Sequence, residues 1–173
     1  MSFHVRHAEP GDAGALVTLA SEVGAEPEGW LITGGEWRSA AEERRYIRAI
    51  RRSAHAAVFV AENSTGLVGR LSIARDTHPA SRHVADLGLL VALEHRRRGI
   101  GRALMEAAEE WALTAGVTKI ELHVFPYNDA AQALYRQLGY EQEGFRRGHY
   151  RRGSELVDAI LMAKQVRREM VGR

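Results

Sequence analysis

The chain of 173 residues is long enough for one domain with a buried core, and 45% hydrophobic and 27% charged residues are typical of a soluble globular protein. The absence of cysteine excludes disulfides and thiolate chemistry, and no apolar run reaches the roughly 18 to 20 residues of a membrane-spanning helix. With a net charge of +2, no apolar leader and no linker or repeat, residues 1–173 are expected to form a single cytoplasmic domain that binds neither membrane nor nucleic acid.

The first half of the chain combines amphipathic helices with strand-like runs. In chain order the patterns predict a strand at 3–8, helices at 10–23 and 39–52, and strands at 56–62, 67–75 and 82–92. Ser39 and Glu42 form an S-x-x-E capping box at the start of the second helix. Residues 24–38, between the two helices, form a loop that carries large apolar side chains.

The second half alternates helices and strands. The patterns predict a helix at 99–115, a strand at 119–125, a helix from Asn128 or Asp129 to 138, and strands at 140–146 and 155–164. Paired arginines at 146–147 and 151–152 are expected at the hairpin between the last two strands, as a solvated basic tip or as a wall that attracts an acidic substrate. The order of elements predicts an α+β fold with a mixed sheet flanked by helices.

A basic, glycine-containing turn opens the helix at 99–115. Arg96, Gly99 and Gly101 satisfy the pattern [RQ]-x-x-G-x-G, directly after a strand. The free N–H groups of a first helical turn, the macrodipole and nearby arginines suit the oxygens of a diphosphate. The Walker pattern is absent, and the dinucleotide fingerprint lacks its third glycine. The alternative is a solvated basic turn that starts a helix.

A second segment, Asn128 to Tyr140, fits N-x-x-A-x-x-L-Y-x-x-x-G-[FY] one helix and one strand later. With both segments, the sequence resembles the GNAT superfamily of N-acetyltransferases over nearly its whole length. By three further strings, at 83–88, at 120–125 and at 141–144 with 157–159, it is most similar in pattern to bacterial L-amino-acid N-acetyltransferases and to relatives that acetylate ribosomal-protein N-termini or phosphinothricin-like amines. Leu93, where proline is common, and Arg97, where glycine is common, depart from the family pattern.

The resemblance implies a GNAT fold, with a mixed, mostly antiparallel sheet of about six to seven strands and four helices, and acetyl-CoA as cofactor. It also implies backbone contacts from the strand before the turn, which splays away from its neighbour, and a general acid at Tyr135. The implied cofactor-binding residues are Leu89, Leu90, Val91, Arg96, Arg97, Arg98, Gly99, Ile100, Gly101, Arg102, Asn128, Ala131 and Tyr135.

The general base is less defined. Asp86 is a candidate on the strand before the turn, although alternation places it with Leu90 and opposite Leu89, an arrangement that only a bulge would change. Glu121 and His123 share one face of the next strand and could hold a proton-accepting water, and Glu36 could recognise a substrate ammonium. Water itself is the remaining alternative.

The expected activity is acetyl transfer to a primary amine of a small molecule, with amino acids the first candidates. The alternatives are acetylation of a protein N-terminus or lysine, and a non-catalytic coenzyme-A-binding sensor. No H-x-x-x-H or Cys/His grouping occurs, so no metal is expected. The resemblance also implies a possible homodimer.

Overall fold

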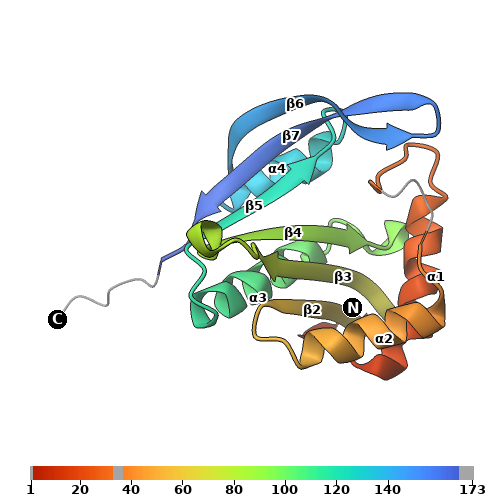
Figure 1. Ribbon diagram of the computed structural model, residues 1–173. Helices are drawn as coiled ribbons and strands as arrows, with labels where there is room; N and C mark the ends of the chain where they lie inside the picture. Colours follow the sequence, from red (N-terminus) through yellow and green to blue (C-terminus); the bar gives the residue numbers. More distant parts are fainter. Residues whose placement is uncertain (1, 33–36, 168–173) are drawn as a thin grey trace.

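The computed structural model describes residues 2–32 and 37–167, which form a central sheet covered by helices on both faces (Figure 1). The strands are β1 (Phe3–His7), β2 (Ala56–Asn63), β3 (Gly66–Arg75), β4 (Val84–Val91), β5 (Lys119–Val124), β6 (Glu141–Arg152) and β7 (Glu155–Gln165). The helices are α1 (Ala13–Gly24), α2 (Ala40–Arg51), α3 (Ile100–Thr114) and α4 (Asp129–Gln137). This mostly antiparallel seven-stranded sheet with four helices in the described residues confirms the predicted fold class.

The sheet has the strand order β1-β2-β3-β4-β5-β7-β6, and β4 with β5 is its parallel pair. That pairing covers three residues of β4, from Val84↔Lys119 to Asp86↔Glu121, whereas β4 continues to Val91. Beyond Asp86 the two strands diverge, as Figure 1 shows. The predicted splay is therefore present, and it leaves one edge of β4 without a partner strand over its second half.

The two faces of the sheet bury different parts of the sequence. On one face, α3 and α4 cover the largest apolar cluster, which includes Leu71, Leu104 and Ile120. Gly69 on β3 allows α3 to approach closely, because a Cβ there would lie 2.9 Å from Leu104 Cδ1. On the other face, α1 and α2 pack on β2 to β4 through two smaller clusters, one of which joins α1 to Leu90 of β4.

Local sequence determines how α2 begins. Ser39 is the N-cap, and its hydroxyl accepts a hydrogen bond from Glu42 N at 3.3 Å. The Glu42 carboxylate accepts in return from Ser39 N at 2.8 Å. The predicted capping box is confirmed, and it fixes the point at which the loop after α1 enters α2.

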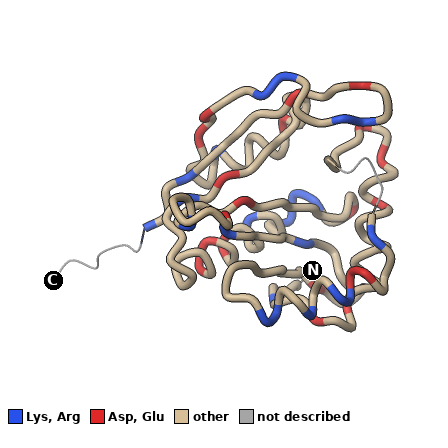
Figure 2. Tube along the Cα trace, viewed as in Figure 1, with Lys and Arg blue, Asp and Glu red and all other residues tan. Residues whose placement is uncertain are grey.

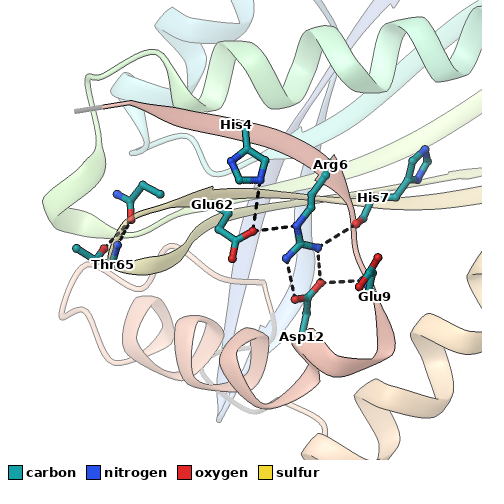
Figure 3. Close-up of polar contacts among 8 residues, drawn as sticks. His4, Arg6, His7, Glu9, Asp12, Glu62 and Thr65 are labelled. Carbon is teal, nitrogen blue, oxygen red and sulfur yellow. Dashed lines mark hydrogen bonds and ion pairs between the residues drawn. The ribbon is translucent and has the colours of Figure 1, made fainter.

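A compact group of charges anchors the N-terminal edge of the sheet (Figure 3). The guanidinium of Arg6 on β1 donates to both carboxylate oxygens of Asp12 at 2.8 and 3.0 Å and to Glu62 of β2 at 2.9 Å. Asp12 also accepts from Glu9 N at 2.7 Å, which closes the short 3-10 turn Pro10–Asp12 before α1. The predicted helix at 10–23 therefore starts as a 3-10 turn.

The last hairpin differs from the prediction. β6 runs through Arg152, and the turn lies at 153–154, so the expected hairpin at 146–152 was wrong. The pairing of β6 with β7 is instead interrupted between Arg146 and Tyr150, where Gly148 has φ +56° and donates its N–H to Asp158 Oδ1 at 2.6 Å. This β-bulge redirects the side chains that follow it.

Candidate active site

A cavity of about 1070 Å³ occupies the divergence between β4 and β5. Its lining includes the second half of β4, the start of α3, the face of α4, the end of β5, Tyr150 of β6 and the loop between α1 and α2. The cavity therefore reaches both faces of the sheet, and the basic turn lies at one end of it.

The backbone of β4 presents alternate residues to this cavity. Ala92 N donates to Val68 O and Asp76 N to Val84 O, both at 2.9 Å, so the even-numbered residues of β4 exchange hydrogen bonds with β3. Leu89 and Val91 therefore point their N–H and C=O groups toward the gap. Leu90 does not, because its backbone is used by β3 and its side chain packs against α1. Of the three backbone contacts predicted on β4, the geometry supports those of Leu89 and Val91.

The turn before α3 is shaped to present N–H groups. Arg97 and Gly99 both have left-handed conformations, with φ +63° and +84°. This conformation explains why glycine suits position 97, since a residue with a Cβ is strained there. Ile100, Gly101 and Arg102 form the first helical turn, so their N–H groups have no intrahelical acceptor. The exposed side chains of Arg97, Arg98 and Arg102 add positive charge beside them.

The Arg96 side chain has partners within the protein. Its Nε donates to Val91 O at 3.0 Å, and its two Nη atoms bind the carboxylate of Glu26, Nη1 to Oε2 at 2.8 Å. Glu26 neutralises this guanidinium, and the phosphate contact expected of Arg96, which lines the cavity, stays a prediction. Glu26 lies in the loop after α1 and also accepts from Trp30 Nε1 at 2.8 Å, so Arg96 joins that loop to the basic turn.

The second sequence segment lines the cavity beside the basic turn. Asn128 is the N-cap of α4, and its side chain accepts from Ala131 N at 3.2 Å. Two turns after this cap, Tyr135 lines the cavity and is 6% exposed. Burial raises the pKa of Tyr135 to about 12, so its phenol is protonated at neutral pH. Gly101 is close by, because a Cβ on it would lie 3.0 Å from Leu134 Cδ2.

Asp86 and Glu121 lie opposite each other where β4 and β5 are still paired. The register of β3 with β4 is regular from Gly69↔Val91 to Arg75↔Ala85, so the bulge that would turn Asp86 to the face of Leu89 is absent from these strands. Burial and the charge of Glu121 raise the pKa of Asp86 to about 6, and Arg146 opposes the rise. The side chain still meets solvent because it lines the cavity.

His123 lies on the same face of the sheet and also lines the cavity. Its Nδ1 is 3.0 Å from the hydroxyl of Tyr150, and its buried Nε2 has no partner among residues 2–32 and 37–167. Burial lowers the pKa of His123, and the charges of Arg146 and His149 act in the same direction. The bulge in β6 brings His149 and Tyr150 to this site, with ring centroids 5.2 and 5.9 Å from that of His123.

Arg152 joins the last hairpin to the loop after α1, a connection that the sequence reading missed. Its guanidinium donates to Gly29 O at 2.7 Å, to Leu31 O at 3.1 Å and to the hydroxyl of Tyr127 at 3.1 Å. It also lies 4.9 Å above the ring of Phe125. The expectation of a solvated basic tip was therefore wrong for Arg152. Glu36, predicted to recognise an ammonium, lies outside the described residues.

Charge is distributed over the whole chain, with basic and acidic residues interspersed on most elements (Figure 2). Across the two described segments, His, Asp and Glu residues form no group of three that could hold a metal ion. Nor does any helix in those segments have the length and apolar character needed to cross a membrane.

Curated proteins of similar sequence include named acetyltransferases. The chain is 31% identical to the L-amino acid N-acetyltransferase AaaT of Escherichia coli over 171 residues, covering 92% of this chain and 96% of that protein. It is 35% identical to the N-alpha-acetyltransferase RimI of Mycobacterium tuberculosis over 146 residues, covering 83% and 86%. The yncA protein of Salmonella typhimurium, solved with its cofactor acetyl-CoA, shares the fold at a TM-score of 0.85 and 16% identity, over 100% of this chain and 99% of that one. The model of the acetyltransferase (GNAT) family matches residues 25–140, and the chain belongs to this family of N-acetyltransferases.

Proposed function

We propose that the protein transfers an acetyl group from acetyl-CoA to the primary amine of a small molecule, by direct attack while both substrates are bound. The observation that carries this proposal is the single cavity between β4 and β5. An anion-binding turn lies at one end and titratable side chains at the other, with the free N–H groups of Leu89 and Val91 between them.

The residues of the cofactor side fit a coenzyme A diphosphate. Three free N–H groups at the start of α3, the positive end of its macrodipole and the arginines at 97, 98 and 102 together suit two phosphate groups. Gly99 has no atom within 4 Å of the position that a Cβ would take, so the approach to these N–H groups is open. Asn128 and Ala131, at the start of α4, line the opposite wall for the pantetheine arm.

Acetyl-CoA supplies the acetyl group as a thioester, whose C–S bond breaks as the new C–N bond forms. The N–H groups of Leu89 and Val91 lie two residues, roughly 7 Å, apart along the strand, so one donates to the carbonyl oxygen, where negative charge develops, and the other is free to bind the pantetheine arm. Tyr135 is protonated and donates to the departing sulfur.

Asp86 is the proposed base. A carboxyl group with a pKa of about 6 is largely ionised at pH 7 and accepts the proton that the amine releases. It lies three residues, roughly 10 Å of strand, from Leu89, so a water molecule completes the path. His123 is the alternative base, in the tautomer that donates from Nδ1 to Tyr150 and leaves Nε2 free to accept.

A small acceptor is favoured over a protein by the contacts of Arg152. Its bonds to Gly29 O and Leu31 O tie the loop after α1 to the last hairpin, and both segments contribute to the cavity lining, through Leu31 and Tyr150. A protein acceptor requires an open groove at this point, where the two segments are in contact. The relative named as an L-amino acid N-acetyltransferase spans nearly the whole chain, which is consistent with a small amine.

The test is thiol release from acetyl-CoA in the presence of free amino acids, polyamines, aminoglycosides and short peptides. We expect stimulation by a class of small amines, with transfer shown by mass spectrometry of the product. Stimulation by peptides alone would replace the proposal with protein N-terminal acetylation. Tight binding of acetyl-CoA without release to any acceptor would favour a non-catalytic sensor.

A further inference from the structure

Arg70 carries a charge in an unusual place, the middle of β3 and the interior of the protein. It is 5% exposed, and its cross-strand neighbours, Val60 and Leu90, are apolar. Burial lowers the pKa of this guanidinium, and the charge of Glu43 opposes the shift. Burying a charge costs free energy unless partners compensate for it. The partners of Arg70 therefore indicate whether its charge is used within the protein or is available to a ligand.

The protein itself satisfies Arg70 only in part. Among the described residues its hydrogen-bond acceptor is Glu43 of α2, with Nη2 at 3.3 Å from Oε1, and its buried Nε has none. Arg–carboxylate pairs are typically shorter, about 2.7 to 2.9 Å, and frequently bidentate. The face of the Trp37 ring lies 5.0 Å from the guanidinium carbon and holds the group in place without using its N–H donors.

The charge of Arg70 is also not fully neutralised. Glu43 is completely buried, and its second oxygen is 3.2 Å from Arg38 Nη1, so two guanidinium groups share one carboxylate. One positive charge remains over this cluster. Arg38 also lies near the Trp37 ring, 5.5 Å from its centroid, and is partly exposed to solvent, whereas Arg70 lines the cavity.

Arg70 faces the acceptor side of the cavity. It lies on the same face of the sheet as Asp86, whose position is four residues along β4 from Leu90, the partner of Arg70. The cross-strand pair Ser72 and Gly88 lies between the positions of Arg70 and Asp86. Because Gly88 has no side chain, the space above the strands there is open. About 13 Å of strand separates the two charged positions, a distance that a long arginine side chain and a short amino acid together span.

We propose that Arg70 binds the carboxylate of the acceptor, which is therefore an amino acid with a free carboxyl group and an amine directed toward Asp86. This inference rests on the proposed function, because it identifies the acceptor of that reaction. The carboxylate would take the N–H donors that Glu43 leaves unused, and it would balance the positive charge of the cluster.

The test compares free L-amino acids with different side chains, L-phenylalanine among them, with their α-amides, which have the amine without the carboxylate. The readout is kcat/KM for the acid divided by kcat/KM for the amide. This ratio is compared between variants, because the different basicity of the two amines affects every variant equally and cancels. We expect Arg70→Met in combination with Glu43→Gln to reduce this ratio roughly 30-fold relative to Glu43→Gln alone. Removing both members of the pair avoids leaving a buried carboxylate without its partner.

Arg38→Gln is an intermediate variant, because Arg38 binds the same carboxylate but does not line the cavity. It removes the excess positive charge and leaves the N–H donors of Arg70 in place, so its ratio should fall by less than that of the double variant. An equal ratio in the double variant and in Glu43→Gln would overturn the inference. Acetylation of polyamines or amides in preference to amino acids would overturn the inference alone, whereas no transfer to any small amine would overturn the proposed function with it.

A measurement on the unchanged protein covers the case in which the double variant does not fold. 3-Phenylpropanoate has the carboxylate and ring of phenylalanine but no amine. It should inhibit acetylation of L-phenylalanine competitively, at a concentration at least tenfold lower than 3-phenylpropanamide requires. Equal inhibition by the acid and the amide would contradict a role for Arg70 in binding the carboxylate.

Discussion

The two sides of the cavity are built in different ways. The cofactor side uses two continuous segments, 89–102 and 128–135, and offers backbone N–H groups at a helix start and along a strand edge. The acceptor side is assembled from side chains of β3, β4, β5, β6 and the loop after α1, with contacts that join residues as far apart as Gly29 and Arg152. The backbone of one side suits a constant ligand, whereas the side chains of the other can change with the acceptor.

The largest effect should come from a change at the start of α3. Gly99→Glu places a negative charge among the free N–H groups at a residue with φ +84°, and should weaken acetyl-CoA binding at least 100-fold. Gly116→Glu is the matched control, because Gly116 is also left-handed, with φ +77°, and also has no atom near its Cβ position, but lies at the other end of α3. Calorimetric titration measures both, and similar losses in the two variants would mean that backbone strain, not the anion site, is responsible.

The next largest effect concerns the proton given to the leaving sulfur. Tyr135→Phe should lower kcat roughly 100-fold while the dissociation constant of acetyl-CoA stays within about threefold. Tyr140→Phe is the control, because that ring is also buried, lies 6.1 Å from Tyr135 and does not line the cavity. Stopped-flow or steady-state thiol release measures kcat, and an unchanged kcat in Tyr135→Phe would remove this residue from the mechanism.

The acceptor side can be weakened without affecting the cofactor. Arg152→Gln removes charged hydrogen bonds to Gly29 O and Leu31 O, and should raise KM for the acceptor about tenfold with acetyl-CoA affinity unchanged. Arg151→Gln, at an exposed neighbouring position, should leave both constants unchanged. A parallel loss of cofactor affinity in Arg152→Gln would show that the two sides are not separable in this way.

The smallest effect is on stability and depends on pH. The pKa of Asp86 is about 6 in the folded protein, above the value of about 3.9 for an unfolded chain, so the fold favours the protonated carboxyl. Its contribution to stability is present below pH 4 and is lost as the pH rises through 6. Asp86→Asn should therefore raise the melting temperature at pH 8 and leave it unchanged at pH 4.

The same variant should abolish the rise in rate through pH 6 that a base at this position produces.

The contrast between the two sides also explains what the sequence could predict. The basic turn and the segment at 128–140 could be predicted, because each is formed by residues that are adjacent in the sequence. The predicted Asn128 cap is confirmed. Only the pairing with β3 shows that the backbone groups of Leu89 and Val91 face the gap while those of Leu90 bind β3, and the sequence does not give that pairing. No local pattern indicates the ion pair of Arg96 with Glu26, because Glu26 lies 70 residues earlier in the chain.

The acceptor side was harder to predict from sequence, because its residues are far apart in the chain. No local pattern indicates the bulge at 147–149, because it depends on a hydrogen bond from Gly148 N to Asp158 on the next strand. No sequence pattern identifies Arg70 as a candidate binding residue, because it is a single arginine within an apolar run and belongs to no motif. Its burial and its shared partner become visible only when α2 is packed against the sheet.

The ion pair between Glu26 and Arg96 has a consequence for the coupling between the two ends of the cavity. It joins the loop after α1 to the residue that begins the basic turn, so the two ends share one structural connection. If a ligand that orders the turn also orders the loop, it strengthens binding at the other end, and linkage requires the second ligand to strengthen binding of the first by the same factor.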